Sequence, residues 1–254
     1  MRARRPLAAL AAAAAASAAL AGPAWALAPS HANITFVPGS TVTPTSTGVI
    51  ASAALVWTPG ASDTGGVGCC MSDISDATTG DKLLEGTPLS RYPFTWDSGA
   101  SLRFQIDSYD ANGSYVGTAF TNAPSFVSNL DVAPETDATY TGTWTTQANS
   151  NALGGSLRYS TAKGAGATFS ASVRTLAWLT TVGPTHGSAR IYIGNTLVKT
   201  VSTYAGHVGY RRIKFVRAWW GGPNDPVRTI RIVNAGTSGH SRVDVDGFVN
   251  ASED

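Results

Sequence analysis

The sequence predicts an all-β protein built from two consecutive β-sandwich domains. Charged residues make up only 13% of the chain, while glycine and proline are frequent, with 27 and 13 copies. Apolar residues recur in short alternating runs separated by turn-forming residues, which is typical of strands with one buried face. Helical apolar periodicity is absent beyond the first residues, so we expect no long helix in the mature chain.

Residues 1–26 predict a secretory signal peptide. Arg2, Arg4 and Arg5 precede an Ala/Leu-rich run over residues 7–21, and small residues near 24–28 offer cleavage positions. The run is too short to span a bilayer comfortably, and no second apolar stretch of about 20 residues follows. We therefore expect a secreted, extracellular chain with no membrane span, and association with the cell wall is left open. The general secretory route is favoured, and the pair Arg4 and Arg5 leaves twin-arginine export as the alternative.

The first domain is expected over residues 27–121. The run 51–57 alternates so that Ala53, Leu55 and Trp57 share one face, and the run 101–109 does the same. The turn DANG at 110–113 contains residues that tolerate left-handed backbone, and apolar residues resume at Tyr115, which predicts a hairpin.

A linker is expected over residues 122–137, which carry Pro124 and Pro134 and few alternating runs. The second domain follows over residues 138–250, where Gly194 and Asn195 predict a two-residue hairpin turn. Seven strand candidates at this spacing favour a sandwich of jelly-roll type. They are 167–173, 176–181, 188–193, 196–203, 211–216, 228–233 and 242–249.

Six strings recur in a consistent order along the second domain: YTGTW (140–144), GAGATF (164–169), AW (177–178), GPTHGSARIY (183–192), TIRIV (229–233) and RVDVDGF (242–248). Through these strings the domain resembles the galactose-binding-like jelly-roll modules, which are similar to carbohydrate-binding modules and occur in bacterial secreted and cell-wall proteins. The first domain resembles a fibronectin type III or immunoglobulin-like domain through LVW (55–57), GGV (65–67), LRFQI (102–106) and DANG (110–113). It departs from that pattern at Leu102, where a tyrosine is usual.

Charge is distributed unevenly between the two domains. Residues 27–136 hold three basic and ten acidic residues, whereas residues 137–254 hold twelve basic and six acidic ones. Opposite charges could draw the domains together, or could leave the second one facing an anionic partner such as an acidic polysaccharide. Independent solvated surfaces are the simpler interpretation.

The two cysteines, Cys69 and Cys70, are adjacent in the sequence. Neighbouring Cα atoms lie about 3.8 Å apart, closer than ordinary disulfides prefer. A vicinal disulfide, two free thiols and an intermolecular bridge are all left open.

Aromatic side chains supply the candidate binding site. A flat ring can stack on the face of a sugar while polar groups bond its hydroxyls. Trp219 and Trp220, followed by glycines, form the first candidate platform, and Tyr204, Tyr210 and Arg211 are secondary candidates. Packing of these rings in the sandwich is the alternative.

Acidic residues suggest a metal at one position only. The resemblance to the jelly rolls implies that Asp246 could help hold a structural calcium ion, which takes six to eight oxygen ligands. A backbone-bonding aspartate is the alternative, and no other cofactor is expected.

Catalysis is not expected. His186, Asp225 and Ser238 follow one another in the His, Asp, Ser order of trypsin-like proteases, and Ser238 lies in the string GTSGH (236–240), but His186 and Ser238 both lie in turn-like sequence. Asp244 and Asp246 would point the same way on one strand and not across a cleft.

These features favour a secreted, non-catalytic binding module for a polysaccharide or cell-envelope glycan. The alternatives are a structural or adhesion protein of the cell surface that contacts another surface protein, and a secreted hydrolase. Nucleic acid is not an expected partner, because the chain is exported and its arginines are scattered.

Overall fold

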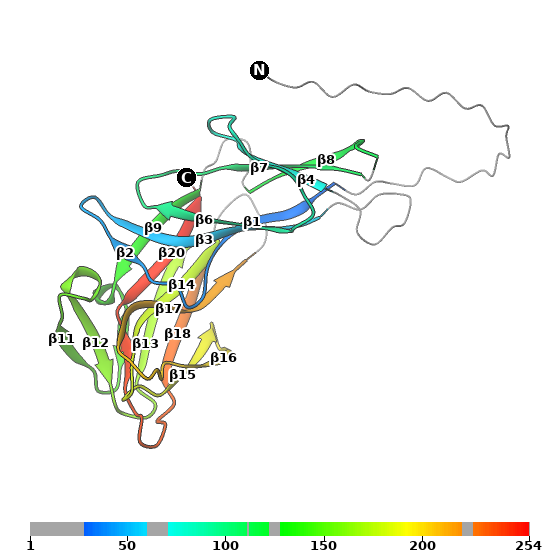
Figure 1. Ribbon diagram of the computed structural model, residues 1–254. Coiled ribbons are helices and arrows are strands. Elements are labelled where there is room, and N and C mark those ends of the chain that lie inside the picture. Colours follow the sequence, from blue (N-terminus) through cyan, green and yellow to red (C-terminus); the bar gives the residue numbers. More distant parts are fainter. Residues whose placement is uncertain (1–27, 60–70, 111, 122–127, 220–225, 254) are drawn as a thin grey trace, which may run out of the picture.

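A computed structural model describes residues 28–59, 71–110, 112–121, 128–219 and 226–253 (Figure 1). Within these ranges the regular elements are strands and two short 3-10 helices, which confirms the all-β class. No helix in the described part is long and apolar enough to cross a membrane. The expected signal peptide, Cys69, Cys70 and Trp220 lie outside the described residues.

The first lobe is a sandwich of two antiparallel sheets. In one sheet β3 is central, with β1 and β2 along one edge and β6 along the other, and the second sheet has the order β5-β4-β7-β8. The strands are β1 (Ser30–Phe36), β2 (Thr43–Pro44), β3 (Val49–Thr58), β4 (Met71–Asp76), β5 (Lys82–Thr87), β6 (Arg91–Asp97), β7 (Phe104–Tyr109) and β8 (Tyr115–Phe120).

The alternating apolar residues of the predicted strands form the core of this lobe. Ala53, Leu55 and Trp57 of β3 are all buried, and Phe104 and Ile106 of β7 pack into the same core. The predicted hairpin joins β7 to β8. Its turn is fixed by the Asp110 carboxylate, which accepts the backbone N–H groups of Asn112 and Ser114 at 2.8 Å each.

The second lobe contains sheets with the orders β10-β13-β18-β15-β16, β17-β14-β20-β9 and β11-β12-β19. The predicted hairpin at Gly194 joins β15 to β16, and Gly194 adopts φ 56°. The strands are β9 (Ser128–Pro134), β10 (Thr139–Thr141), β11 (Thr145–Ala148), β12 (Ser156–Ser160), β13 (Gly166–Ser172), β14 (Thr175–Val182), β15 (Ser188–Ile193), β16 (Thr196–Ser202), β17 (Gly209–Ala218), β18 (Val227–Asn234), β19 (Val243–Val245) and β20 (Gly247–Glu253); the 3-10 helices are η1 (Glu135–Asp137) and η2 (Leu153–Gly155).

Most of the expected linker is regular structure. Residues 122–127 lie outside the described ranges, but 128–134 form β9, which pairs with β20 from Ser128 to Pro134. Leu130 and Ala133 are buried on opposite faces of this strand. Pro134 ends an edge strand, where the missing N–H breaks no ladder. The second lobe therefore begins at β9, ahead of residue 138.

The run expected as one strand over 242–249 is also divided. β19 ends at Val245 and pairs with β12, whereas β20 begins at Gly247 and pairs with β14. Asp246 lies at the break between them, so Asp244 and Asp246 do not belong to one continuous strand.

The two lobes share one layer, the sheet β17-β14-β20-β9. All eight residues of β14 are buried. Ala177 and Leu179 pack into the core of the first lobe, while Leu176 and Trp178 pack into the core of the second. A central layer covered on both faces therefore joins two sandwiches into one body.

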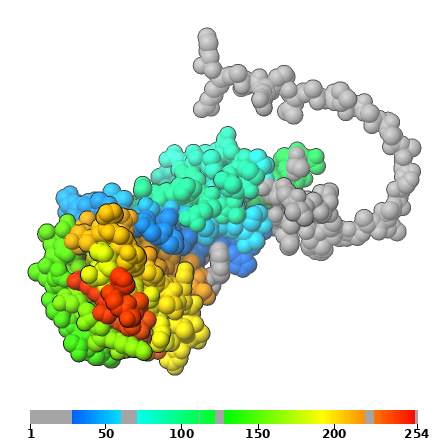
Figure 2. All heavy atoms as spheres, turned by 60° about the horizontal axis from the view of Figure 1, so that its bottom comes forward, coloured from blue at the N-terminus to red at the C-terminus, as the bar shows by residue number. Residues whose placement is uncertain are grey.

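Backbone hydrogen bonds reinforce this junction. Val42 N donates to Arg211 O at 3.0 Å and Ile213 N donates to Ser40 O at 3.0 Å, so the segment after β1 lies along the edge of β17. At the opposite edge, Leu102 N donates to Ser128 O at 2.9 Å. In Figure 2 the blue residues of the first lobe lie directly against yellow and orange residues of the second.

Candidate functional site

A polar pocket of about 120 Å³ opens on the second lobe beside the loop that joins β16 to β17. Its lining comes from the sheet β11-β12-β19 and its flanks, from β14 and the turn after it, and from this loop and the start of β17. The lining residues are Gln147, Asn149, Leu157, Thr181, His186, Val208, Tyr210 and Arg242.

Asp244 organises the base of this pocket. Its carboxylate is fully buried and accepts two hydrogen bonds from Arg242, Nε to Oδ1 at 2.6 Å and Nη2 to Oδ2 at 2.8 Å. His186, itself only 4% exposed, places Nε2 at 3.2 Å from Oδ2. A buried charge is tolerated when it is paired and hydrogen-bonded, so these partners hold Asp244 in place.

The same arginine is fixed toward the pocket wall. Arg242 Nη2 also donates to Gln147 Oε1 at 2.8 Å, and its guanidinium lies 4.2 Å from the centroid of the Tyr159 ring. Thr180 Oγ1 donates to the carbonyl of Asp244 at 2.7 Å. The polar surface offered by Arg242 and Gln147 is therefore held in one arrangement before any ligand arrives.

Three buried polar atoms of lining residues lack hydrogen-bond partners. Within the described residues, no hydrogen bond reaches Thr181 Oγ1 or either ring nitrogen of His186, although His186 Nε2 lies within ion-pair distance of Asp244. A buried hydroxyl without a partner costs free energy, so such groups are normally satisfied by water or by a ligand. The pocket can thus accept a molecule that brings hydroxyl groups.

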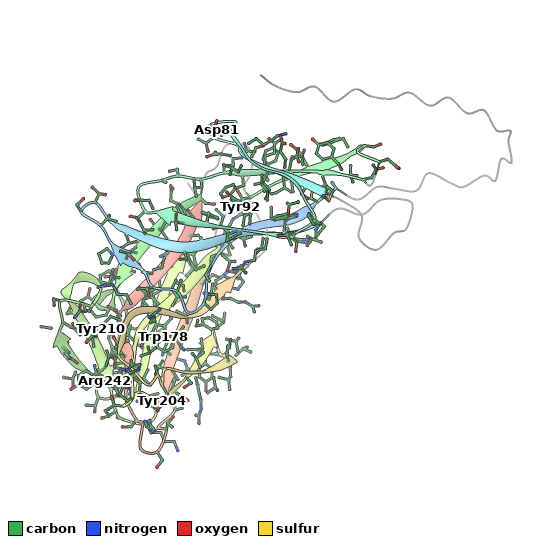
Figure 3. The ribbon with its side chains drawn as sticks, in the orientation of Figure 1. Asp81, Tyr92, Trp178, Tyr204, Tyr210 and Arg242 are labelled. Carbon is green, nitrogen blue, oxygen red and sulfur yellow. The ribbon has the colours of Figure 1, made fainter. Side chains whose placement is uncertain are left out.

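Aromatic rings lie around this part of the surface. Tyr210 is half-buried in the pocket wall, and Tyr204 is 53% exposed with its ring edge-on to His240 at 5.0 Å between centroids. Figure 3 shows Tyr210, Arg242 and Tyr204 toward the lower end of the second lobe, away from Asp81 and Tyr92 of the first.

Trp219, the described member of the tryptophan pair expected from sequence, lies outside this pocket. It packs partly against the second core, and its carbonyl accepts Asn33 Nδ2 of the first lobe at 2.8 Å. Arg228 lies over its ring at 5.1 Å. Trp220 is outside the described residues, so binding at these two residues stays a prediction.

Arg211 holds the fold together at the junction of the lobes. It adopts φ 51°, which is uncommon for a residue with a side chain. Its Nε donates to Val42 O at 3.0 Å and its Nη1 donates to Asn151 O at 2.5 Å. Both ends of the guanidinium are thus occupied by backbone carbonyls from two different segments.

Asp246 is fully buried, and its Oδ1 accepts Leu153 N at 2.6 Å. Burial is the main cause that raises the pKa of this carboxyl from 3.8 to about 6, and the nearby Glu135 adds to it, while the backbone N–H groups of Leu153 and Arg211 oppose the rise. Asp246 Oδ2 has no partner among the described residues. This oxygen suits a cation, but no group of three His, Cys, Asp or Glu side chains in the described part could hold one. Calcium at Asp246 stays a prediction.

The residues considered for hydrolysis are not brought together. His186 is buried against Asp244, whereas Ser238 is exposed in the loop before β19, and no hydrogen bond between described atoms joins Ser238 to His186. Asp225 lies outside the described residues.

Sequence reasoning missed Gln147, Asn149, Thr181 and Arg242 as pocket residues. One signal for Arg242 is available: it precedes Asp244 by two positions, and residues two apart on a strand lie on the same face. The amide and hydroxyl side chains carry no such signal, because they reach the pocket only through the fold.

No protein-family model and no curated protein matches this sequence. Among solved structures, the Agl-KA catalytic domain is 17% identical with a TM-score of 0.34, over 48% of this chain and 27% of that one. An exo-β-1,3-galactanase from Phanerochaete chrysosporium is 11% identical with a TM-score of 0.36, over 87% of this chain and 56% of that one. A structure described by the promiscuous specificity of carbohydrate-binding modules from the β-sandwich superfamily is 13% identical with a TM-score of 0.24, over 89% and 94%. All three TM-scores are too low to carry a functional argument, so function is inferred from this chain's own site.

Proposed function

We propose that this chain is an exported, non-catalytic carbohydrate-binding protein, which holds part of a glycan in the pocket beside Tyr210. The observation that carries the proposal is the convergence there of a half-buried aromatic ring, a fixed guanidinium and buried polar atoms without partners. Sugars present an apolar ring face together with hydroxyl groups, and such a pocket matches both.

The size of the pocket limits what enters it. About 120 Å³ corresponds to roughly four water molecules. That space accepts the hydroxyl-bearing edge of one sugar ring, with the rest of a polymer outside. Thr181 Oγ1 and the side chains of Asn149 and Arg242 would bond the hydroxyls, and the Tyr210 ring would contact the apolar face.

The positions of the carboxyl groups around the pocket support a binding role without catalysis. Glycosidases of the common type need two carboxyl groups facing each other across the substrate. None of the residues that line this pocket in the described part of the chain is acidic, and Asp244 beneath them is engaged by Arg242 and His186.

Export and a cell-envelope target remain part of the proposal. They are supported by the basic and then apolar first residues, and by the resemblance of the second lobe to jelly-roll modules of bacterial secreted proteins.

The proposal is tested by binding the purified chain from residue 27 onward to a panel of insoluble polysaccharides and cell walls, followed by calorimetry with soluble fragments of any polymer that retains it. We expect Tyr210→Ala to weaken binding about fivefold, because a lost stacking contact is worth roughly 1 kcal/mol. Thr181→Val keeps the shape and removes the hydroxyl, so it should also weaken binding.

Tyr115→Ala is the matched control, since Tyr115 is 60% exposed on β8 of the first lobe. Retention that Tyr115→Ala leaves intact and Tyr210→Ala reduces supports the site. Loss with Trp219→Ala and not with Tyr210→Ala would move the site to the tryptophan. Failure of the folded chain to bind any polymer would overturn the carbohydrate proposal and favour a protein partner.

A further inference from the structure

A second, larger cleft of about 370 Å³ adjoins the polar pocket, and Val208 contributes to the lining of both. The β16–β17 loop forms one wall, with Val182 of β14, and Gly39 of the first lobe closes one side. The cleft is therefore completed only when both lobes are in place.

The ionisable side chains that line this cleft are an arginine, a lysine and a histidine. Arg212 and Lys214 project from β17 and His207 comes from the loop, and the lining contains no acidic residue. Within the described ranges neither Arg212 nor Lys214 forms an ion pair with a carboxylate. Both are half-buried, so part of their hydration is lost without a compensating anion.

The fold leaves the Arg212 guanidinium most of its donors. Its Nη1 donates to the carbonyl of Gly39 at 3.2 Å, which uses one of five N–H groups. A Cβ at Gly209 would lie 3.1 Å from Arg212 Nε, so the glycine lets the side chain lie close along the loop. The planar fork that remains matches the two oxygens of a carboxylate or phosphate.

We propose that this cleft binds an anionic group, a carboxylate or a phosphate, carried by the same glycan that enters the polar pocket. This inference rests on the proposed function and narrows it to acidic polymers. Because the cleft and the pocket meet at Val208, one chain can place a neutral sugar edge in the pocket and a charged substituent beside Arg212 and Lys214. The excess of basic over acidic residues in 137–254, twelve against six, would draw such a polymer toward this lobe.

The test compares an acidic polymer with its neutral ester and adds a polymer that carries phosphate in place of carboxylate. Binding of the whole chain from residue 27 is measured by affinity electrophoresis and calorimetry with polygalacturonate, with its fully methyl-esterified form, and with poly(glycerol phosphate). We expect at least a tenfold preference for an acidic polymer over the neutral ester at about 0.05 M salt, falling as salt is raised. Preference for polygalacturonate assigns a carboxylate, and preference for poly(glycerol phosphate) assigns a phosphate.

The variant Arg212→Gln/Lys214→Gln should lose this preference and keep its affinity for the neutral ester. The matched control is Arg190→Gln/Lys199→Gln, which removes two exposed cations from the neighbouring strands β15 and β16 of the same lobe and should keep the preference. Circular dichroism verifies that each variant folds.

The inference is overturned if the wild type binds the acidic and neutral polymers equally, or if both double variants lose the preference to the same extent. In either case binding that still depends on Tyr210 leaves the carbohydrate proposal standing. If the chain binds none of these polymers or those of the wider panel, both proposals fall together.

Discussion

Asp244 and Asp246 are both fully buried, yet their partners differ. Arg242 donates two hydrogen bonds to the Asp244 carboxylate, and His186 Nε2 lies 3.2 Å from its Oδ2. Asp246 receives a backbone N–H from Leu153 but has Glu135 nearby, and burial dominates its titration. At the residue scale, the Asp244 carboxylate therefore supports the candidate site, whereas ionisation of the Asp246 carboxylate lowers the stability of the folded protein.

The raised pKa of Asp246 predicts how the free energy of unfolding changes with pH. In the unfolded chain the Asp246 carboxyl titrates near 3.8, and in the folded chain its pKa is raised to about 6. Between these values the folded protein holds the proton and the unfolded chain does not, so stability is lost as the pH rises through this window. The shift corresponds to about 3 kcal/mol. Asp246→Asn should remove this loss, so its stability relative to the wild type rises by about that amount between pH 4 and pH 7.

Urea unfolding at several pH values in the presence of a chelator measures the difference. Parallel curves for the wild type and Asp246→Asn would refute the assignment. Added calcium that stabilises the wild type at pH 7 and not Asp246→Asn would support a structural calcium at this carboxylate, because a bound cation favours the ionised form. Calcium that changes neither protein would argue against it.

Local pattern explains which residues of the site could be predicted. Tyr204 and Tyr210 are conspicuous in sequence because they flank a short glycine-containing loop before a run of alternating residues, and the structure brings Tyr210 into the pocket. Gln147 and Arg242 meet although 95 positions separate them. Only the pairing of β11 with β12 and of β12 with β19 brings them together, and side-chain type alone gives no sign of it.

At the scale of elements, predictability follows burial. β15 has alternating buried positions and is predicted with its bounds. β16 is exposed at six of its seven positions, and the turn at Gly194 is what marks it: the sequence predicts 196–203, and the strand is Thr196–Ser202. β5 is missed, because it is exposed at four of its six positions and so lacks an apolar period. The sequence predicts a linker where β9 lies, because prolines occur at 124 and 134, and only its pairing with β20 shows that this segment is a strand. β14 is recognised as a strand, but its burial on two faces leaves no polar face to read.

Because β14 is buried on both faces, shortening one of its side chains should strongly lower the stability of the protein. Leu179 is fully buried and faces the core shared with the first lobe, so Leu179→Ala should destabilise the protein by about 2 to 5 kcal/mol. Leu197→Ala on β16 is the matched control: Leu197 is 50% exposed, and its loss should change stability by no more than about 0.5 kcal/mol. Urea unfolding followed by tryptophan fluorescence compares the two. Equal effects would mean that the face of β14 toward the first lobe is not packed as described.

At the scale of the whole molecule, the central sheet decides how the lobes relate. One core cluster includes Ile34, Trp96 and Ile106 from the first lobe together with Leu130, Leu179 and Val249 from the sheet of the second. Domains joined by a linker would each bury their own core, whereas here unfolding either lobe exposes apolar surface on the other. The cleft beside Arg212 depends on the same junction, because Gly39 belongs to its lining.

This shared layer predicts that the chain unfolds as one cooperative unit. Differential scanning calorimetry of residues 27–254 should give a single transition whose calorimetric and van't Hoff enthalpies agree. Leu179→Ala should lower the temperature of that transition without splitting it, because the truncated contact belongs to both lobes. Leu197→Ala should leave its temperature nearly unchanged. Two outcomes would contradict this prediction: two separate transitions in the wild type, or a Leu179→Ala variant in which only one lobe melts early. Either would mean that the lobes are stabilised independently and that the contacts across β14 contribute little to stability.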